Sequence, residues 1–343
     1  MCALAKDIGI DLGTASVLVY IKGKGVVLNE PSVVAIDKNT GKLLKVGEDA
    51  RQMLGRTPGN IVAIRPLRDG VISDYDMTER MLREFILKVS GFMLFKPRVI
   101  ICVPSGITEV EERAVIDAGI QAGARKVYLI EEPVAAAIGA GVDIAEPHGT
   151  MIVDIGEGAA DMAVISLNGI AIANSTHIAG ANFNDAIVKY VRKKFNLLIG
   201  DRMAEEAKIA IGCAYPRKKL ETFLLKGRHA MTGLPETVVM NSDEMIEALI
   251  EPAISIVRTV QETLEETPPE LLADIFTDGI YLTGGSASLY GFSTLLSKKT
   301  KIPVVTFDNP ENCVVLGAGK AIKYIDKIDS RGHGKLNPLV AYT

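Results

Sequence analysis

Short apolar, β-branched runs alternate with glycine or polar turns over the first part of the chain, which is typical of strands. These runs predict strands at 8–11, 17–21, 26–28 and 32–36. We expect the four strands to form one antiparallel meander. From 78 to 89 the apolar positions recur at helical spacing, which predicts a helix with one buried face. The run 98–103 is typical of a central strand, and Thr108 with Glu111 forms a capping box for a helix that ends at Gln121.

A second strand and helix follow directly. Residues 127–130 are β-rich, and Glu131-Glu132-Pro133 leads into an alanine-rich helix at 134–140. This order implies a parallel portion of sheet with helices on its faces. In the second half we predict helices at 182–195, 201–212, 242–250 and 253–265, strands at 279–283 and 304–307, and a last helix opened by 317–321. The tail, 330–343, has no apolar period and is expected to be disordered.

The strand and turn at the start of the chain recur in its second half. An apolar strand reaches Asp11 and turns at Gly13, and the strand 151–155 carries Asp154 and turns at Gly156. Two copies of one strand-and-turn motif predict two similar domains, with a boundary near Pro147.

Composition narrows the class of protein. The chain has 343 residues, about two domains, and its 48% hydrophobic content is ample for two cores. A net charge of −4 with interspersed signs gives no support to nucleic-acid binding. Four cysteines without a CxxC pair fit a reducing cytoplasm, and four histidines without ligand spacing argue against structural zinc. No apolar run reaches the roughly 20 residues that span a bilayer, so we expect a cytoplasmic protein that could still lie on a membrane.

One loop is unusually apolar. Phe92, Met93, Leu94 and Phe95 stand where a polar connection is expected before the strand at 98–103. Two interpretations stay open from the residues: the side chains tuck under the sheet, or they contact a membrane or a partner.

Three glycine turns, each at the carboxyl end of a strand, carry the candidate chemistry. In open α/β sheets such ends bind ligands. Gly13 permits a tight turn, including a left-handed one, and the amides of Thr14, Ala15 and Ser16 then suit a phosphate. Bare phosphate would be repelled by Asp11, which points to a hydrated divalent cation between them.

Neither a Walker P-loop nor a GxGxxG fingerprint is present. The three turns therefore predict a nucleotide clamped between two domains. Its phosphates would be held by the Asp11 and Asp154 turns, and its base or ribose would lie near the Gly284 turn.

Several motifs resemble one superfamily. DIGIDLGTAS, VDIGEG, LTGGSASL and LGAGKAI resemble the two phosphate loops, adenosine loop and second connecting segment of the actin, heat-shock chaperone and sugar kinase ATPases. Within it, NEPSVVAID, FKPRVIICVPSGITEVEERAV, LIEEPVAAAIGAG and TPPELLADI resemble the bacterial actin family MreB, over about 6–325. The resemblance implies an α/β, actin-like (ribonuclease H-like) two-domain fold with a nucleotide cleft between the duplicated domains. Domain I would comprise 1–146 plus 315–329, with a small subdomain at about 30–75, and domain II 147–314, with one at about 180–250.

The function implied by this resemblance is cytoskeletal. Such a protein binds ATP and Mg²⁺ and forms homopolymeric filaments on the inner face of the cytoplasmic membrane. There the filaments organise cell-wall synthesis with membrane proteins of the elongation machinery and maintain rod shape. Two alternatives remain: a filament-forming paralogue with negligible hydrolysis, and a sugar kinase of the same fold. The kinase would need a catalytic aspartate and a polar sugar pocket, which we do not find in the sequence.

The resemblance also assigns roles to residues. Glu132 would orient the attacking water, with Asp11 and Asp154 holding Mg²⁺ through water, and residues 92–95 would insert into the membrane. Glu205 and Lys208, one helical turn apart, would contact the ribose and adenine. The implied nucleotide-binding residues are Asp11, Gly13, Thr14, Ala15, Ser16, Asp154, Gly156, Glu157, Gly158, Ala159, Glu205, Glu206, Lys208, Gly284, Gly285, Ser286, Ala287 and Ser288.

The chain departs from the family pattern at the second phosphate loop. That loop usually reads GGGTT, whereas here it reads Gly156-Glu157-Gly158-Ala159-Ala160, without either hydroxyl. In similar proteins a threonine at position 159 pairs with the residue matched by Glu132 to hold the water, so we expect a slow ATPase. Ser286 and Tyr290 also replace the usual glycine and arginine around the adenosine loop.

Overall fold

A computed structural model describes residues 7–68, 70–90, 96–325, 335–336 and 339–342. The chain forms two compact units. The first comprises Met1–His148, Ile165–Ala173 and Asn312–Thr343, and the second comprises Gly149–Val164 and Asn174–Glu311. Within the described ranges, no helix has both the length and the apolar character needed to cross a membrane.

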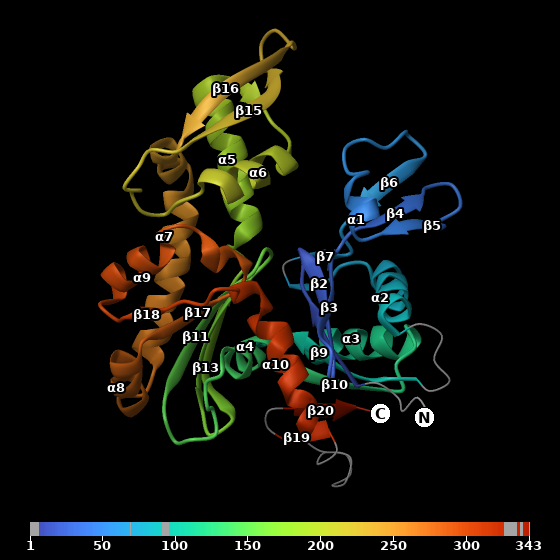
Figure 1. Cartoon of the computed structure of the whole chain (residues 1–343), viewed down its shortest axis with the longest axis vertical. Helices are drawn as coiled ribbons and strands as arrows, with labels where there is room; N and C mark the ends of the chain where they lie inside the picture. The colour runs from blue at the N-terminus through green and yellow to red at the C-terminus, as the bar shows by residue number, and fades with distance from the viewer. Residues whose placement is uncertain (1–6, 69, 91–95, 326–334, 337–338, 343) are drawn as a thin grey trace. The chain divides into compact units, whose positions relative to one another are not determined.

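The first unit is built on a large mixed sheet, ordered β19-β20-β10-β9-β1-β2-β3 (Figure 1). Its strands are β1 (Asp7–Leu12), β2 (Ser16–Ile21), β3 (Gly25–Pro31), β9 (Arg98–Val103), β10 (Lys126–Glu131), β19 (Lys335–Leu336) and β20 (Leu339–Tyr342). Two small sheets accompany it, made by β4 (Val34–Asp37), β5 (Leu43–Val46) and β6 (Ile61–Ile64), and by β7 (Leu67–Arg68) and β8 (Val71–Ile72). Its helices are α1 (Glu48–Arg51), α2 (Tyr75–Ser90), α3 (Glu109–Gln121), α4 (Glu132–Ala140) and α10 (Cys313–Ala321), which continues into η3 (Ile322–Tyr324).

Side-chain alternation along β1 divides the sheet into two faces. Ile8, Ile10 and Leu12 are buried in one cluster with residues of α2 and α3. The intervening residues point the other way, because successive strand residues face opposite sides. Gly9 lies against α10, since a Cβ built there would be 3.0 Å from the Ala318 Cβ. Asp11 therefore belongs to the face that α10 covers.

Helices α4 and α10 cross in close contact on that face (Figure 1). A Cβ at Gly317 would lie 1.7 Å from the carbonyl oxygen of Ala135, and one at Gly139 would lie 1.8 Å from that of Cys313. Only glycine permits this approach, because a methyl group would overlap backbone atoms. The crossing fixes α4, and with it Glu132 at the first position of that helix.

Two predictions for the first unit were wrong. The fourth predicted strand does not continue the meander: β1, β2 and β3 pair antiparallel in sequence, but β4 pairs with β5 and β6 in a separate sheet. The tail predicted to be disordered contributes β19 and β20, and β20 pairs antiparallel with β10. A short apolar strand needs no apolar period of its own when a sheet edge supplies its hydrogen bonds.

A sheet ordered β13-β12-β11-β17-β18 lies mainly in the second unit, with residues 165–166 of β12 and 169–173 of β13 assigned to the first. Its strands are β11 (Thr150–Ile155), β12 (Ala160–Ser166), β13 (Gly169–Thr176), β17 (Ile280–Thr283) and β18 (Val304–Val305). A smaller sheet joins β14 (Leu197–Leu198), β15 (Thr222–His229) and β16 (Pro235–Asn241). The helices are α5 (Gly180–Phe195), α6 (Asp201–Ile211), α7 (Ser242–Glu266), α8 (Pro269–Asp278) and α9 (Phe292–Thr300), with single turns η1 (Gly285–Ser288) and η2 (Pro310–Asn312).

Helix α7 is continuous, where the sequence predicted two helices separated at Pro252. It begins at a capping box between Asn241 and Glu244 and keeps an apolar stripe on both sides of the proline. Burial of that stripe outweighs the local cost of the proline.

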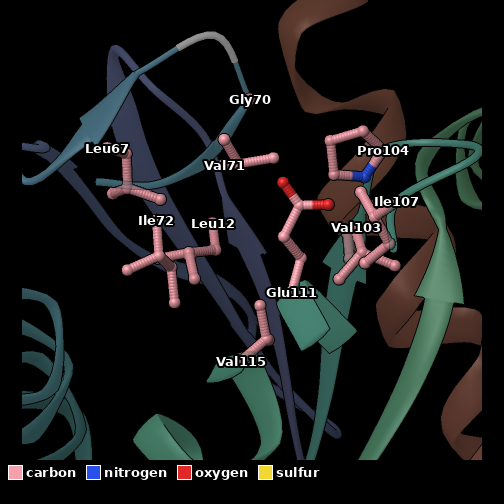
Figure 2. A pocket seen from close by; sticks show the side chains of 11 residues that line it. Leu12, Leu67, Gly70, Val71, Ile72, Val103, Pro104, Ile107, Glu111 and Val115 are labelled. Carbon is pink, nitrogen blue, oxygen red and sulfur yellow. The ribbon is translucent and has the colours of Figure 1, made fainter. Parts of the chain in front are cut away.

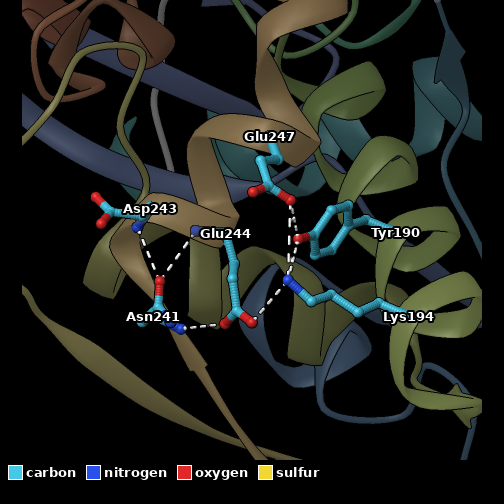
Figure 3. A network of polar contacts seen from close by, with 6 residues as sticks. All are labelled: Tyr190, Lys194, Asn241, Asp243, Glu244 and Glu247. Carbon is cyan, nitrogen blue, oxygen red and sulfur yellow. Dashed lines mark hydrogen bonds and ion pairs between the residues drawn. The ribbon is translucent and has the colours of Figure 1, made fainter.

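The N-terminal end of α7 is joined to α5 by a polar network (Figure 3). Lys194 Nζ lies 2.9 Å from Glu244 Oε1 and donates to Tyr190 Oη at 2.8 Å, and Tyr190 Oη donates to Glu247 at 2.5 Å. These contacts brace the helix that begins beside the second glycine turn.

Candidate functional site

The first glycine turn lies at the end of β1 and is closed by its own backbone. The amide of Gly13 donates to the Ser16 carbonyl at 3.1 Å, and Ser32 Oγ donates to the Gly13 carbonyl at 2.6 Å. Thr14 Oγ1 accepts from the Gly70 amide at 3.0 Å. Gly13 lies in the tight turn that the sequence predicts, without the left-handed backbone that glycine would also permit. Glycine suits this position because a Cβ there would lie 2.9 Å from the Ser16 carbonyl oxygen.

Beside this turn the first unit has a small hollow (Figure 2). Its apolar wall includes Leu12, Val71 and Ile107, and Glu111 points into the hollow between Val71 and Pro104. Glu111 is also the capping-box residue of α3 and accepts from the Thr108 amide at 2.8 Å, as the sequence predicted.

Glu132 is half-buried at the start of α4, with Pro133 next to it. Proline suits the first turn of a helix because its missing N–H has no partner there anyway. The glycine-mediated crossing of α4 and α10 holds this end of the helix in place within the first unit.

The second glycine turn follows β11 and is tied to helix α5. The amide of Gly156 donates to the Ala159 carbonyl at 3.0 Å, which closes the turn. The amides of Gly180 and Ala181, at the start of α5, donate to the carbonyls of Gly156 and Glu157 at 3.1 and 2.8 Å. The start of α5 thus holds the second glycine turn through main-chain hydrogen bonds, and the phosphate-binding role of this turn stays a prediction.

Asp154 is buried in β11, just before this turn. Thr283 Oγ1 donates to its Oδ1 at 2.7 Å. Desolvation raises the pKa of Asp154 to about 6, although the Thr283 hydrogen bond acts in the opposite direction. A nearby cation would stabilise the ionised form of this desolvated carboxylate.

Asp161 is the residue that the sequence reasoning missed. It is 1% exposed in β12, where Ser175 Oγ donates to it at 2.8 Å. Desolvation raises the pKa of Asp161 to about 7, against the Ser175 hydrogen bond, and the charge of Asp154 adds to the rise. The available signal was a carboxylate inside an otherwise apolar strand, directly after the altered loop.

Glu157 and Lys208 meet in the second unit. Lys208 Nζ lies 3.5 Å from Glu157 Oε2 and donates to the Gly180 carbonyl at 3.0 Å. Glu205 shares the half-buried face of α6 with Lys208, whereas Glu206 is exposed and pairs with Arg202 at 3.0 Å. Of the three α6 residues predicted to bind nucleotide, Lys208 is thus the one seen at the second turn.

The third glycine turn joins the second. Gly284 has a φ of 88°, and a Cβ there would lie 2.4 Å from the Ile155 carbonyl oxygen, so glycine is required. In the following η1, Ser286 Oγ donates to the Gly156 carbonyl at 2.8 Å. The predicted residues Gly285, Ala287 and Ser288 lie in the same turn. The predicted membrane residues 92–95 lie outside the described part of the chain.

Comparisons of the sequence with known proteins identify the family of this chain. The sequence profile of the MreB/Mbl protein family matches residues 5–330. Over 328 residues the chain is 51% identical to the cell shape-determining protein Mbl of Bacillus subtilis (strain 168), covering 95% of this chain and 98% of Mbl. It is 50% identical to the cell shape-determining protein MreB of Escherichia coli (strain K12), covering 94% of each.

A solved structure agrees with the sequence matches. The crystal structure of MreB5 of Spiroplasma citri bound to AMPPNP aligns with a TM-score of 0.91 and 36% identity, over 96% of this chain and 99% of that one. The same MreB5 has also been crystallised bound to ADP. The predicted actin-like fold is confirmed by this match. The chain belongs to the MreB/Mbl family.

Proposed function

We propose that this chain binds ATP with Mg²⁺ and polymerises into filaments on the inner face of the cytoplasmic membrane. There the filaments would organise cell-wall synthesis with membrane proteins of the elongation machinery and maintain rod shape. One observation carries the nucleotide part of the proposal: in the second unit, the second and third glycine turns are joined by the Ser286–Gly156 hydrogen bond at 2.8 Å beside the N-terminus of α5. The AMPPNP and ADP bound to MreB5 further support nucleotide binding, and the names of the relatives, cell shape-determining proteins, support the role in cell shape.

The residues present fit Mg²⁺. This ion takes oxygen ligands, keeps several waters, and needs only one or two carboxylates together with phosphate oxygens. Asp154 is a buried carboxylate whose pKa is raised by desolvation, and Asp11 stands at the corresponding position of the first unit, at the end of β1. When bound, Mg²⁺ would neutralise charge on the phosphate oxygens. Asp11 and Asp154 would orient its water ligands.

Hydrolysis in this proposal is slow. Glu132 would orient the attacking water, and the family's threonine partner is replaced by Ala159, which is 9% exposed and has no hydroxyl. That substitution favours the second candidate, a filament-forming paralogue with negligible turnover. A sugar kinase is not favoured, because the chain belongs to the MreB/Mbl family.

Membrane attachment rests on the apolar residues 92–95. Burying Leu94 and Phe95 gives about 3 to 6 kcal/mol before the cost of ordering, so firm attachment needs many subunits acting together, as in a filament. We expect the double substitution Leu94→Ser with Phe95→Ser to abolish co-sedimentation with liposomes while polymerisation continues. Undiminished sedimentation would place the membrane contact elsewhere.

Electron microscopy on lipid with ATP or ADP, paired with phosphate release, tests the proposal. We expect nucleotide-dependent filaments on the lipid and slow phosphate release. The substitution Asp11→Ala should weaken binding of Mg²⁺-ATP in calorimetry. Absence of filaments with either nucleotide, or unchanged affinity in Asp11→Ala, would contradict the assignment.

A further inference from the structure

Glu157 is held as a fixed charge within the second phosphate loop. Its side chain and that of Lys208 are each 12% exposed, with Oε2 and Nζ 3.5 Å apart. Its other oxygen, Oε1, accepts from Asn184 Nδ2 at 3.3 Å. Both carboxylate oxygens therefore have partners inside the second unit, and the side chain has little freedom to swing into solvent.

The start of α5 is shaped to receive this carboxylate. A Cβ at Gly180 would lie 2.4 Å from Glu157 Oε2 and 2.7 Å from Ser286 Oγ, so a larger residue there would have to displace these two side chains. The N-terminus of a helix also favours a negative charge. The start of α5 therefore leaves space for the Glu157 carboxylate. The family's usual loop sequence has glycine at this position.

Lys208 makes two contacts at the second glycine turn. Its ammonium group contacts Glu157 and donates to the Gly180 carbonyl at 3.0 Å. A lysine beside a phosphate loop would ordinarily attract phosphate, but the positive charge of Lys208 is balanced by the loop's own carboxylate. The amides of Gly180 and Ala181 are already used in hydrogen bonds to the carbonyls of Gly156 and Glu157. Phosphate would therefore bind through other backbone amides of the loop, and the Glu157–Lys208 pair adds no net charge there.

We propose that Glu157 makes nucleotide binding by this chain depend strongly on a divalent cation, by adding a negative charge to the loop and holding Lys208. The inference rests on the proposed function, because it takes the second turn to bind phosphate. Glu157 is in this view a residue that sets the cation requirement of the site. It need not touch the nucleotide.

The test compares the full chain with Glu157→Gln, which keeps the shape and the Asn184 contact but removes the charge. The dissociation constant of N-methylanthraniloyl-ADP is measured by fluorescence anisotropy in excess Mg²⁺ and again in EDTA. We expect the ratio of the two constants, EDTA over Mg²⁺, to fall about tenfold in Glu157→Gln, the effect of one charge roughly 10 Å from phosphate at an intermediate dielectric. Lys208→Met, which leaves Glu157 unpaired, should raise the ratio by a similar factor.

Glu265→Gln, an exposed change of the same charge on α7, is the matched control and should leave the ratio unchanged. A merely structural role for Glu157 would weaken binding equally in both buffers, so an unchanged ratio in both Glu157→Gln and Lys208→Met overturns the inference. Failure of the unaltered chain to bind the probe even in Mg²⁺ would overturn the proposed function, and this inference with it.

Discussion

Replacing Asp161 by asparagine tests the buried carboxylate pair of the second unit. Asp161 is 1% exposed and has a pKa raised to about 7, chiefly by desolvation, compared with an ordinary value of 3.8. Because the folded state binds this proton more tightly than the unfolded state, its contribution to stability is fully present below about pH 4. That contribution is lost as the pH rises through about 7.

The size of the effect follows from linkage. Each unit of pKa difference corresponds to about 1.4 kcal/mol, so the rise of about three units in the pKa of Asp161 implies a loss of about 4 kcal/mol between pH 4 and pH 8. Asparagine cannot ionise and is nearly the same size, and its Oδ1 can still accept from Ser175. We therefore expect Asp161→Asn to match the natural chain near pH 4 and to be more stable by about 4 kcal/mol at pH 8.

Urea unfolding at several pH values, in EDTA and without nucleotide, measures this difference. The exposed Asp185→Asn on α5 serves as the control, since a solvated carboxylate should give a difference that barely changes with pH. If the stability difference between Asp161→Asn and the natural chain stays constant from pH 4.5 to 8, the desolvation argument is wrong.

Three further changes have direct expected outcomes. Ala159→Thr should raise phosphate release by about one to three powers of ten, because a positioning contact is restored; an unchanged rate would remove the paired-water argument. Gly317→Ala should lower the free energy of unfolding by more than about 3 kcal/mol, seen in thermal or urea unfolding, because its methyl group would overlap the Ala135 carbonyl; a stable variant would show that α4 and α10 can separate cheaply. Replacing both Val340 and Ala341 by proline should speed hydrogen exchange of the β10 amides that face β20, while the conservative pair Val340→Thr and Ala341→Val should not.

Local patterns predicted the elements well where a short-range interaction decides them. The capping box of Thr108 and Glu111 opens α3 as expected, and the apolar run at 98–103 is strand β9. These features depend on neighbours within a few residues, so the sequence contains what is needed. The glycine turns were found for the same reason, since a strand end followed by glycine is a local signal.

Features that depend on distant partners could not be predicted in the same way. Only the folded chain brings the edge of β10 to β20, or the carbonyl of Ala135 to Gly317. The pairing of Lys208 with Glu157 likewise joins residues far apart in sequence. The family resemblance assigns Lys208 to the ribose and adenine, and only the three-dimensional arrangement shows its contact with the loop's own carboxylate.

The substitutions in the second loop should affect nucleotide binding and nucleotide hydrolysis to different extents. The backbone of the loop is held by contacts to main-chain atoms that need no hydroxyl at position 159: the Gly156–Ala159 hydrogen bond, the hydrogen bonds from the α5 amides and the one from Ser286. Binding of phosphate to a turn of this kind depends on main-chain amides, which the substitutions do not remove. Positioning of a water molecule depends instead on the side chain that Ala159 lacks. The substitutions should therefore slow turnover far more than they weaken binding, and a chain that holds nucleotide for long periods is the expected consequence.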